Sequence, residues 1–383
     1  MLNAEALAGN IRKYREMHRM NQTELARRLF VTPQTVSKWE NGQAVPDLQN
    51  LCNLAEALDA DLDALLARKS SSQVYRTMIG IDGGGTKTDF ILFREDGAVL
   101  HRLILGGSNP NACGMENACR TLQLGIDQLL AAKSEVVGVF AGLAGISVGD
   151  NQSVMEQFFR RQYPRLPITF DTDILNVIHS VRGVEKCAAA ICGTGSVVYG
   201  CDGKTLRRAG GYGFIFDGAG SGFDIGRDVL SRCMECDDGI TPPSLLTRLA
   251  EQKLGGTAHA RLDRLYDRNL DFVASFAPLA FEASHGGDPA AAEILERNFA
   301  RLARLIRFVQ QVCDCGTEVV VAGGLTRLRE DFEHYLGSAL DGAKLRIPDM
   351  PPVYGACVKC ASLYGTPVDD DLFDSTFRQT LTN

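Results

Sequence analysis

The sequence predicts a multidomain protein in which a small all-α head precedes a larger α/β body. Residues 1–68 show apolar side chains at helical spacing and two helix caps separated by a short turn. From residue 76 onward, apolar strands alternate with glycine-rich turns and then with helical segments, which is typical of α/β proteins. The serine-rich stretch 69–75, KSSSQVY, is predicted to be a polar linker between them.

Length and charge agree with this division. The chain has 383 residues, enough for two or three domains, and a net charge of −7. Residues 1–45 carry seven Lys and Arg against four Glu, which gives +3, so the remainder supplies −10. A slightly basic head on an acidic body suits a phosphate-rich partner at the head only. No apolar run approaches the roughly 18 residues that span a bilayer, so we expect a cytoplasmic protein without a membrane partner.

The head shows two helices joined by a tight turn. Asn21 is a good N-cap for the segment QTELARRL, and Thr32 is a good N-cap for PQTVSKWE, which has Pro33 at its first position. Two short helices separated by about four residues form a helix-turn-helix, whose second helix enters the major groove of DNA. Two more helices are expected at residues 48–58 and 61–67.

The string NQTELARRLFVTPQTVSKWENG closely resembles the Cro/C1-type (XRE) helix-turn-helix family, and the resemblance covers residues 8–66. It implies binding to a double-stranded DNA operator, usually as a homodimer on a palindromic site. It also implies that Pro33, Gln34 and Lys38 face base edges; Gln34 suits adenine and Lys38 suits guanine. The side chains implied to lie nearer the phosphates are Gln22, Thr35, Ser37 and Asn41. A helical module used only for protein contacts is the alternative.

The body opens with TMIGIDGGGTKTDFILFREDGAVLHRLIL, which reads as three strands joined by a glycine-rich turn and an Asp-Gly turn. The stretch IDGGGTKTD matches neither a Walker A loop nor the GxGxxG pattern. Backbone N–H groups and threonine hydroxyls at such a turn can contact a polyphosphate, and Asp82 stands where a hydrated Mg²⁺ belongs. A glycine-rich β-turn without a ligand would explain most of the same pattern.

Two later segments repeat this arrangement. ICGTGSVVYG, residues 191–200, is again a strand, a Gly-Thr-Gly turn and a strand, and a glycine pair closes the strand EVVVA. The set resembles the actin/hexokinase/Hsp70 superfamily, in which two ribonuclease H-like lobes close on ATP. Within it, residues 77–365 resemble the BadF/BadG/BcrA/BcrD ATPase–N-acetylglucosamine kinase family. The resemblance rests on ordered strings that include GGSNPNACG, GLAGIS, TFDTD, GGYGF, GSGFDIGRDVL, VVVAGGL and PPVYGAC.

This resemblance implies binding of ATP with Mg²⁺ and transfer of a phosphoryl group to an amino sugar such as N-acetylglucosamine. It implies a first lobe at 76–182 and a second at 183–383, with a C-terminal helix free to return to the first. The implied ATP contacts are Gly84, Gly85, Thr86, Lys87, Thr88, Gly193, Thr194, Gly195, Ser196, Gly323 and Gly324, with Asp82 on Mg²⁺ through water. The implied sugar contacts are Asn109, Gly145, Tyr212 and Asp217.

The family's catalytic base is an aspartate about twenty residues before the second loop, and Asp173 lies 20 residues before Gly193. Asp171 is the second candidate, because alternation along a strand sends both side chains to the same face. Asp173 would also serve as the N-cap of a helix that follows the strand. Asn109, which precedes a proline, has a simple turn role as its alternative.

One segment departs from the family pattern. Where the family commonly shows GDEGSG, this chain has FDGAGSG at residues 216–222. The usual Asp and Glu positions hold Gly218 and Ala219, and an acid remains one step earlier, at Asp217. In an extended backbone a one-residue shift turns a side chain to the opposite face. One sugar contact is therefore predicted to be altered, whereas both loops and the candidate base are present.

Three functions are compatible with these features. We favour a transcriptional regulator whose body senses or phosphorylates an amino sugar. The second is an active amino-sugar kinase with an accessory DNA-binding domain, and the third is a BadF-type ATPase that activates a partner enzyme through an iron–sulfur cluster. The pairs Cys233/Cys236, Cys357/Cys360 and Cys313/Cys315 are interpreted as small buried hydrophobic residues, with a metal site as the alternative.

Overall fold

The computed structural model describes residues 4–18, 20–58, 60, 62–66, 75–132, 135–266 and 270–381. The chain divides into two compact units, Met1–Tyr75 and Arg76–Asn383. Residues 69–74 of the predicted linker lie outside the described residues. Within the described ranges, no helix is both long and apolar enough to cross a membrane.

The first unit is all-α, as predicted. Asn21 caps the second helix in a capping box with Glu24, and the Thr32 side chain accepts a hydrogen bond from the Thr35 backbone N–H at the start of the third. Val36 and Trp39 are buried in the core of this unit. The helices are α1 (Ala4–Met17), α2 (Gln22–Arg28), α3 (Pro33–Glu40), α4 (Leu48–Ala57) and α5 (Leu62–Leu65).

The turn between α2 and α3 contains a strained residue. Phe30 has a φ of 57°, a left-handed conformation that costs non-glycine residues energy. Its side chain is 96% exposed, so no packing of the ring within the unit offsets this cost. Phe30 therefore lowers the stability of the head where a glycine would not.

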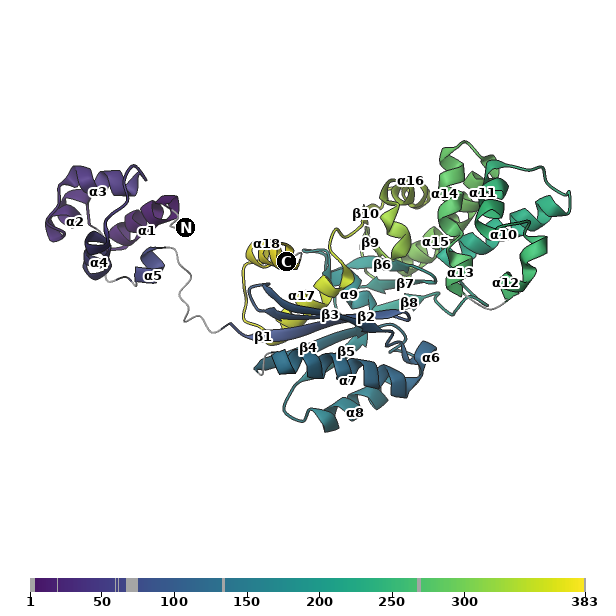
Figure 1. Ribbon diagram of the computed structural model, residues 1–383, viewed down its shortest axis with the longest axis horizontal. Helices are drawn as coiled ribbons and strands as arrows, with labels where there is room; N and C mark the ends of the chain where they lie inside the picture. Colours follow the sequence, from purple (N-terminus) through teal and green to yellow (C-terminus); the bar gives the residue numbers. More distant parts are fainter. Residues whose placement is uncertain are drawn as a thin grey trace. The chain divides into compact units, whose positions relative to one another are not determined.

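The second unit contains two five-stranded sheets, so the predicted two-lobed α/β architecture is confirmed (Figure 1). The first sheet has the order β3-β2-β1-β4-β5 and the second the order β10-β9-β6-β7-β8. The strands of the first are β1 (Thr77–Gly83), β2 (Lys87–Arg94), β3 (Val99–Gly106), β4 (Val136–Leu143) and β5 (Ile168–Thr172). Those of the second are β6 (Cys187–Cys192), β7 (Ser196–Cys201), β8 (Leu206–Ala209), β9 (Glu318–Ala322) and β10 (Lys344–Arg346).

The strand register places the two predicted loops at equivalent positions. β1 and β2 are antiparallel with Gly83 opposite Thr88, and β6 and β7 are antiparallel with Cys192 opposite Ser196. β4 runs parallel to β1, and β5 runs parallel to β4. In the second sheet, β9 runs parallel to β6. Because parallel strands end at the same edge of a sheet, each hairpin turn lies beside the ends of the adjoining parallel strands.

Helices cover both faces of each sheet. α7 and α8 cover one face of the first sheet, and α17 and α18 cover the other (Figure 1). The first-lobe helices are α6 (Pro110–Cys113), α7 (Met115–Ala132), α8 (Asn151–Gln162) and α9 (Ile174–His179), and the C-terminal ones are α17 (Pro352–Tyr364) and α18 (Asp370–Leu381). The two C-terminal helices, α17 and α18, thus pack on the first sheet, whose strands come earlier in the sequence.

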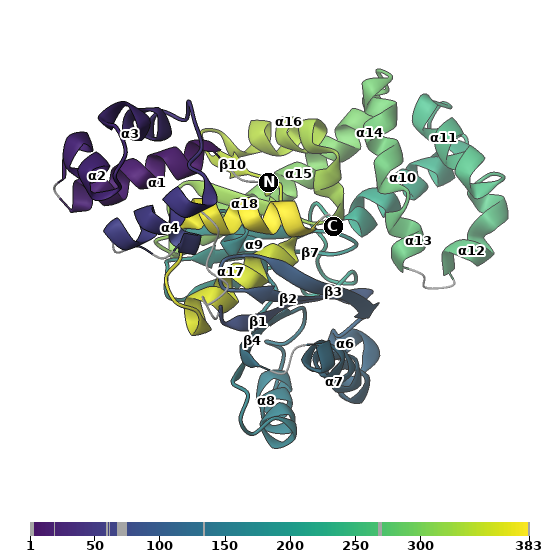
Figure 2. The same cartoon turned by 60° about the vertical axis from the view of Figure 1, so that its left-hand side comes forward.

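α9 lies between the two sheets. Its apolar side chains pack with β6, β7 and β9, and its Asn176 contacts β1 and β4. A group of helices follows β8 and stands to one side of the sheets in both views (Figures 1 and 2). These and the remaining helices are α10 (Gly222–Asp237), α11 (Leu245–Leu254), α12 (Leu262–Tyr266), α13 (Leu270–Ala274), α14 (Ala277–His285), α15 (Pro289–Val312) and α16 (Arg329–Leu340), with 3₁₀ turns His259–Arg261 and Gly324–Arg327.

Two of the three cysteine pairs lie on helices, and Cys313 and Cys315 lie in the connection between α15 and β9. Cys357 and Cys360 are fully buried on α17, and Cys233 is buried on α10. All twelve cysteines are free thiols. Among the described residues, no group of three or more His, Cys, Asp or Glu side chains is placed to hold a metal ion.

Candidate functional site

The first glycine-rich loop is a hairpin turn that rests on the GGSN segment. The Gly84 N–H donates to the Lys87 carbonyl at 2.9 Å and closes the turn. The Gly84 carbonyl accepts hydrogen bonds from the backbone N–H groups of Ser108 at 3.0 Å and Asn109 at 3.2 Å. A Cβ at Gly107 would lie 2.0 Å from the Gly85 carbonyl oxygen, so glycine is required for this approach. Asn109 is thereby held beside the loop.

Residues of this loop differ in exposure. Gly85, Thr86 and Lys87 are exposed, whereas Thr88 is fully buried. The Thr88 Oγ1 donates to the Gly106 carbonyl at 2.8 Å and lies 2.8 Å from the Ser108 hydroxyl. The structure thus places Thr88 beneath the loop as support, and its hydroxyl does not face the open side.

The second loop is fastened to the start of α10. The Gly193 N–H donates to the Gly195 carbonyl at 2.9 Å. The N–H groups of Gly222 and Phe223 donate to the Gly193 and Thr194 carbonyls at 2.8 and 3.0 Å. The Ser196 hydroxyl is buried and donates to the Ala219 carbonyl at 2.7 Å. The loop is therefore held in a fixed shape before any ligand binds.

The predicted glycine pair adjoins the second loop. Gly323 has a φ of 122°, and a Cβ there would lie 2.2 Å from the Cys192 carbonyl oxygen. The pair is therefore packed against the strand end that leads into Gly193. A Cβ built at Gly85, Gly195 or Gly324 would meet no atom within 4 Å, so these three glycines border open space. Open glycine turns with exposed backbone groups fit a polyphosphate.

Asp82 and Asp173 are two half-buried carboxylates that interact electrostatically. Asp82 is the penultimate residue of β1 and accepts a hydrogen bond of 2.6 Å from Asn176 Nδ2. Burial raises the pKa of Asp82 to about 7, the Asn176 hydrogen bond opposes that rise, and the charge of Asp173 adds to it. The two carboxylates are thus close enough to influence each other's ionisation.

This donor set fits a hard divalent cation. Magnesium prefers carboxylate and water oxygens, and Asp82 keeps one carboxylate oxygen outside its hydrogen bond to Asn176. A cation beside Asp82 would also stabilise the ionised form that burial disfavours. The residues present therefore fit Mg²⁺ at Asp82.

Asp173 directly precedes α9 and is half-buried. It stands at the N-cap position, but its side chain makes no capping hydrogen bond, so a capping role does not explain it. Thr172 Oγ1 donates to its carboxylate at 3.2 Å. Burial raises the pKa of Asp173 to about 6, while hydrogen bonds from Thr172 and from the backbone N–H groups of Asp173 and Ile174 lower it, as does the positive charge of Arg208. At neutral pH such a carboxylate is mostly ionised and is more basic than an ordinary aspartate.

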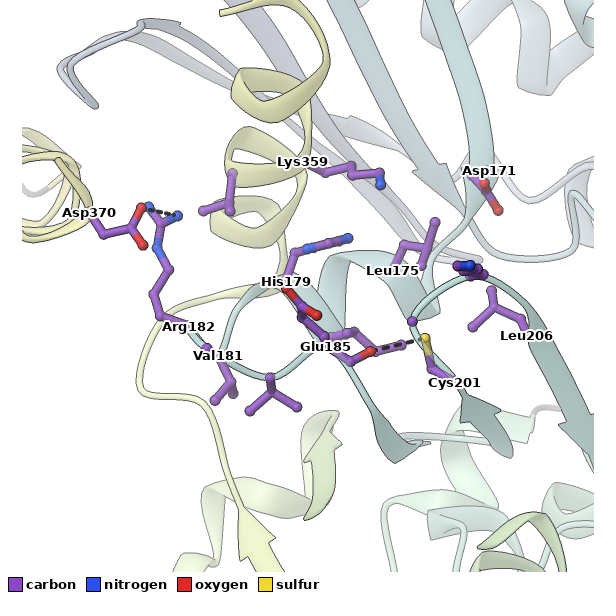
Figure 3. Close-up of a pocket in the computed structure, with 16 residues that line it drawn as sticks. Asp171, Leu175, His179, Val181, Arg182, Glu185, Cys201, Leu206, Lys359 and Asp370 are labelled. Atoms are coloured by element: carbon purple, nitrogen blue, oxygen red, sulfur yellow. Dashed lines mark hydrogen bonds and ion pairs between the residues drawn. The ribbon is translucent and has the colours of Figure 1, made fainter. Parts of the chain in front are cut away.

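The structure separates Asp171 from Asp173, so the expectation that both share one face is wrong. The backbone of Asp173 is helical, with φ −58° and ψ −21°, and strand alternation therefore ends before it. Asp171 instead lines a cavity of about 630 Å³ whose wall also includes His179 and Lys359 (Figure 3). Burial raises the pKa of Asp171, and Lys359 lowers it. None of the predicted ATP contacts lines this cavity.

The predicted sugar contacts of the first lobe lie together. Asn109 caps α6, and its Oδ1 accepts the Asn111 N–H at 2.9 Å, which is the turn role of the alternative interpretation. Gly145 has a φ of 76°, and a Cβ there would lie 2.3 Å from Asn109 Oδ1. Asn111 and Asn151 both donate to the Gly145 carbonyl, at 3.1 and 2.9 Å. A polar rim of three asparagines thus surrounds Gly145.

The sugar contacts predicted in the second lobe are arranged differently. Tyr212 is 65% exposed, with the Arg208 guanidinium 5.3 Å from its ring centre. The Asp217 carboxylate turns back and accepts the Gly211 N–H at 2.8 Å. A Cβ at Gly218 would lie 2.8 Å from the carboxylate of Asp224, and Ala219 is buried. In this backbone neither 218 nor 219 offers space for the acidic side chain that the family pattern carries.

In the head, α3 presents the predicted DNA contacts. Pro33, Gln34, Lys38 and Asn41 are exposed, and Thr35 and Ser37 are half-buried. Asn41 is positioned from two sides, since its Oδ1 accepts from Arg12 at 2.9 Å and its Nδ2 donates to Ser37 at 3.3 Å. The exposed side of α3 therefore carries the polar groups that a helix in the major groove needs.

Gln22 is held inside the head rather than left free. Its Nε2 donates a hydrogen bond of 2.8 Å to the buried carboxylate of Glu40. The same carboxylate accepts hydrogen bonds of 2.5 and 3.0 Å from Arg15. Burial pushes the pKa of Glu40 upward, but the hydrogen bonds from Arg15 and Gln22 together hold it below its usual value. This network fixes α3 against α1 and α2.

Sequence reasoning missed three residues of the body site. Asn176, the partner of Asp82, lies three residues after Asp173 on one helix face, so its spacing offered a signal. Arg208 donates to the Gly210 carbonyl at 3.0 Å, and Asp271 accepts a hydrogen bond of 2.8 Å from Thr194 Oγ1. Neither Arg208 nor Asp271 belongs to a recognisable motif.

Comparisons with known proteins follow the same division of the chain. Residues 79–359 match the profile of the BadF/BadG/BcrA/BcrD ATPase family, and residues 11–65 match a helix-turn-helix family. The chain is 31% identical over 67 residues to an uncharacterized HTH-type transcriptional regulator of Bacillus subtilis, which covers 18% of this chain and 58% of that protein.

The body is similar to sugar kinases. The chain is 28% identical over 293 residues to the N-acetylmuramic acid/N-acetylglucosamine kinase of Clostridium acetobutylicum, covering 71% of this chain and 94% of that protein. It is 27% identical over 235 residues to the N-acetyl-D-glucosamine kinase of Dictyostelium discoideum, covering 57% and 74%. A ROK family transcriptional regulator, a homolog of the E. coli MLC protein, shares the fold with a TM-score of 0.52 at 12% identity, covering 99% of this chain and 98% of that one.

Proposed function

Because this chain belongs to the BadF/BadG/BcrA/BcrD ATPase family and begins with a helix-turn-helix unit, we propose that it is a DNA-binding transcriptional regulator. Its body binds ATP with Mg²⁺ and an amino sugar such as N-acetylglucosamine, and this binding changes operator affinity. It acts in the cytoplasm as a homodimer, since helix-turn-helix units bind palindromic operators in pairs.

The observation that carries this proposal is the altered turn 216–222. Asp217 is engaged by Gly211, and positions 218 and 219 carry no acid that could reach a sugar. The turn lies beside the second loop, because the Ser196 hydroxyl donates to the Ala219 carbonyl. A site with both loops but without these acids suits ligand binding with weak turnover better than efficient catalysis.

The roles of the chain's own residues follow from their positions. Gly84, Gly85, Thr86, Lys87 and the 193–195 turn would hold the phosphates, with Gly323 and Gly324 beside the adenosine and Asp82 beside the metal. Asn109, Gly145 and Tyr212 would hold the sugar. When bound, ATP with Mg²⁺ supplies a transferable phosphoryl group. These assignments are proposals that rest on the loop geometry and on similarity to kinases.

An active amino-sugar kinase with an accessory DNA-binding domain is the second candidate. The half-buried carboxylate of Asp173 favours it, because a pKa of about 6 suits a group that accepts a proton from a sugar hydroxyl. Asp173 has no capping hydrogen bond that would explain it otherwise.

An ADP-release screen across amino sugars separates the two candidates. Wild-type protein is compared with Asp173→Asn and with the control Asp150→Asn, which removes a carboxylate from the start of α8. Sugar-dependent ADP release that disappears only in Asp173→Asn identifies a kinase. Sugar binding by calorimetry without ADP release identifies a sensor, and absence of both sugar and ATP binding contradicts the proposal.

A further inference from the structure

The Asp271 carboxylate, from the group of helices that follows β8, accepts a hydrogen bond from the Thr194 hydroxyl of the second loop. Asp271 is exposed on α13, and it accepts a hydrogen bond of 2.8 Å from Thr194 Oγ1. A threonine hydroxyl has one proton to donate, so this bond and one to a phosphate cannot coexist. The proposed phosphate contact of Thr194 is thus already taken in the structure.

Close packing on α10 positions the backbone of α13, which carries Asp271. A Cβ at Gly226 of α10 would lie 2.0 Å from the Val273 carbonyl oxygen, and a Cβ at Gly222 would lie 3.3 Å from the Ala274 side chain. Because only glycine permits this approach, α13 is held directly on α10. The same α10 holds the second loop through the Gly222 and Phe223 N–H groups. Loop and carboxylate therefore share one support.

α13 also borders the space beside the loop. Leu270, the residue before Asp271, lines a cavity of about 200 Å³ together with Thr194 and Gly195. Asp217 lines the same cavity. A phosphate that enters next to Thr194 would approach the Asp271 carboxylate that is hydrogen-bonded to Thr194, and like charges repel.

We propose that Asp271 is a gate on nucleotide binding. In the nucleotide-free protein its carboxylate takes the hydrogen bond that Thr194 gives to a phosphate, and a nucleotide must displace it to bind. The gate lowers the affinity for nucleotide and makes that affinity depend on a cation that neutralises the phosphates. This inference rests on the proposed ATP site.

The gate differs from a magnesium-binding role in its dependence on the metal. A carboxylate that helps to bind Mg²⁺ would strengthen ATP binding only when the metal is present. A carboxylate that competes with phosphate weakens binding most when the metal is absent, because no bound cation then neutralises the phosphate charge. ATP affinity with and without Mg²⁺ therefore distinguishes them.

The test is calorimetric ATP binding by the full chain, in EDTA and in Mg²⁺, for wild type, Asp271→Asn and Asp271→Ala. Both variants are expected to bind ATP about five- to tenfold more tightly in EDTA, as for loss of one unfavourable charge at an exposed site. The gain is expected to be smaller in Mg²⁺. Asp271→Glu keeps the charge and is expected to stay close to wild type.

Asp263→Asn is the matched control, because Asp263 is an exposed acid of α12 in the same helical group. It tests whether net charge alone changes affinity, and a gain equal to that of Asp271→Asn overturns the gate. Unchanged or weaker ATP binding by both Asp271 variants, with wild type binding ATP, also overturns it and leaves the proposed function intact. If no variant binds ATP in either buffer, the proposed function fails and the gate with it. Binding by the variants alone supports a closed gate.

Discussion

Asn176 donates a hydrogen bond of 2.6 Å to Asp82 and so joins α9, which directly follows Asp173, to β1, in which Asp82 is the penultimate residue. The same amide nitrogen donates to the Gly142 carbonyl at 3.1 Å. Within the described residues, its Oδ1 is buried without a hydrogen-bond partner. Asn176 thus donates to both Asp82 and Gly142 and leaves a buried acceptor unsatisfied, an arrangement that serves the site more than stability.

The first prediction concerns Asn176→Ala. Loss of the hydrogen bond is expected to raise the pKa of Asp82 further, because the larger of the two influences that oppose burial is removed and only the charge of Lys87 remains. The Mg²⁺-dependent part of ATP affinity at neutral pH should fall by about tenfold, as for one lost hydrogen bond to a charged group. Calorimetry in Mg²⁺ and in EDTA measures this part. Asn117→Ala on the exposed side of α7 is the control, and equal losses in both variants would remove the special role of Asn176.

The second prediction concerns pH and stability without a metal. The pKa values of Asp82, about 7, and Asp173, about 6, are raised above the usual aspartate value, so the folded body binds more protons than the unfolded chain between roughly pH 4 and 7. Their stabilising contribution is therefore present below about pH 4 and is lost as pH rises through 7.

Asp82→Asn is expected to remove much of this pH dependence. Because the site is only half-buried, we expect a gain of about 1–2 kcal/mol at pH 8 and little change at pH 5. Denaturant unfolding of the body in EDTA at both pH values measures the difference. If Asp82→Asn is no more stable than wild type at pH 8, ionisation of the half-buried Asp82 does not destabilise the folded body.

The third prediction concerns Phe30, which has a φ of 57° and is 96% exposed. Phe30→Gly is expected to stabilise the head by about 1 kcal/mol, because glycine adopts this conformation without steric cost. Phe30→Ala removes the ring but keeps the constraint, and it should give no comparable gain. Thermal unfolding of the head in the full chain is the measurement. A gain in Phe30→Ala alone would point to the ring and not to the backbone.

The fourth prediction concerns recognition by α3. Gln34→Ala and Lys38→Ala are each expected to weaken operator binding by about 1–3 kcal/mol and to relax specificity at one base pair. Gln49→Ala is the control, because Gln49 is an exposed glutamine on α4. Anisotropy titrations on operator DNA selected from random duplexes give both affinity and base preference. Uniform weakening on all duplexes with a smaller salt slope would instead assign the side chain to the phosphates.

Much of the fold could be predicted because local chemistry determines it. Asn21 and Thr32 are strong helix caps, and both begin helices in the structure. Glycine turns between apolar runs predicted both hairpins, whose register places residues 84–86 and 193–195 at the turns. The packing of α17 against the first sheet depends on tertiary contacts between segments far apart in the chain, so the sequence left that position open.

The site could be predicted less completely. Strand alternation paired Asp171 with Asp173, but the chain turns into a helix at Asp173, and Asp171 faces another cavity. The side chain of Asp217 was expected to change face, and in the folded turn it bends back to Gly211. Asp271 comes from a segment without a motif, and only the packing of α13 on α10 brings it to Thr194. Contacts of this kind depend on folded geometry, which spacing alone does not encode.

Operator affinity measured with and without ligand tests the regulator proposal most directly. Anisotropy titrations would compare the full chain alone, with N-acetylglucosamine, with ATP and Mg²⁺, and with both. Coupling between two sites must equal a difference in ligand affinity between two states, and such couplings are typically about five- to 150-fold. We predict a change in operator affinity in this range that is lost in Asn109→Ala. Identical operator affinity under all four conditions, with sugar and ATP binding verified by calorimetry, would contradict the account.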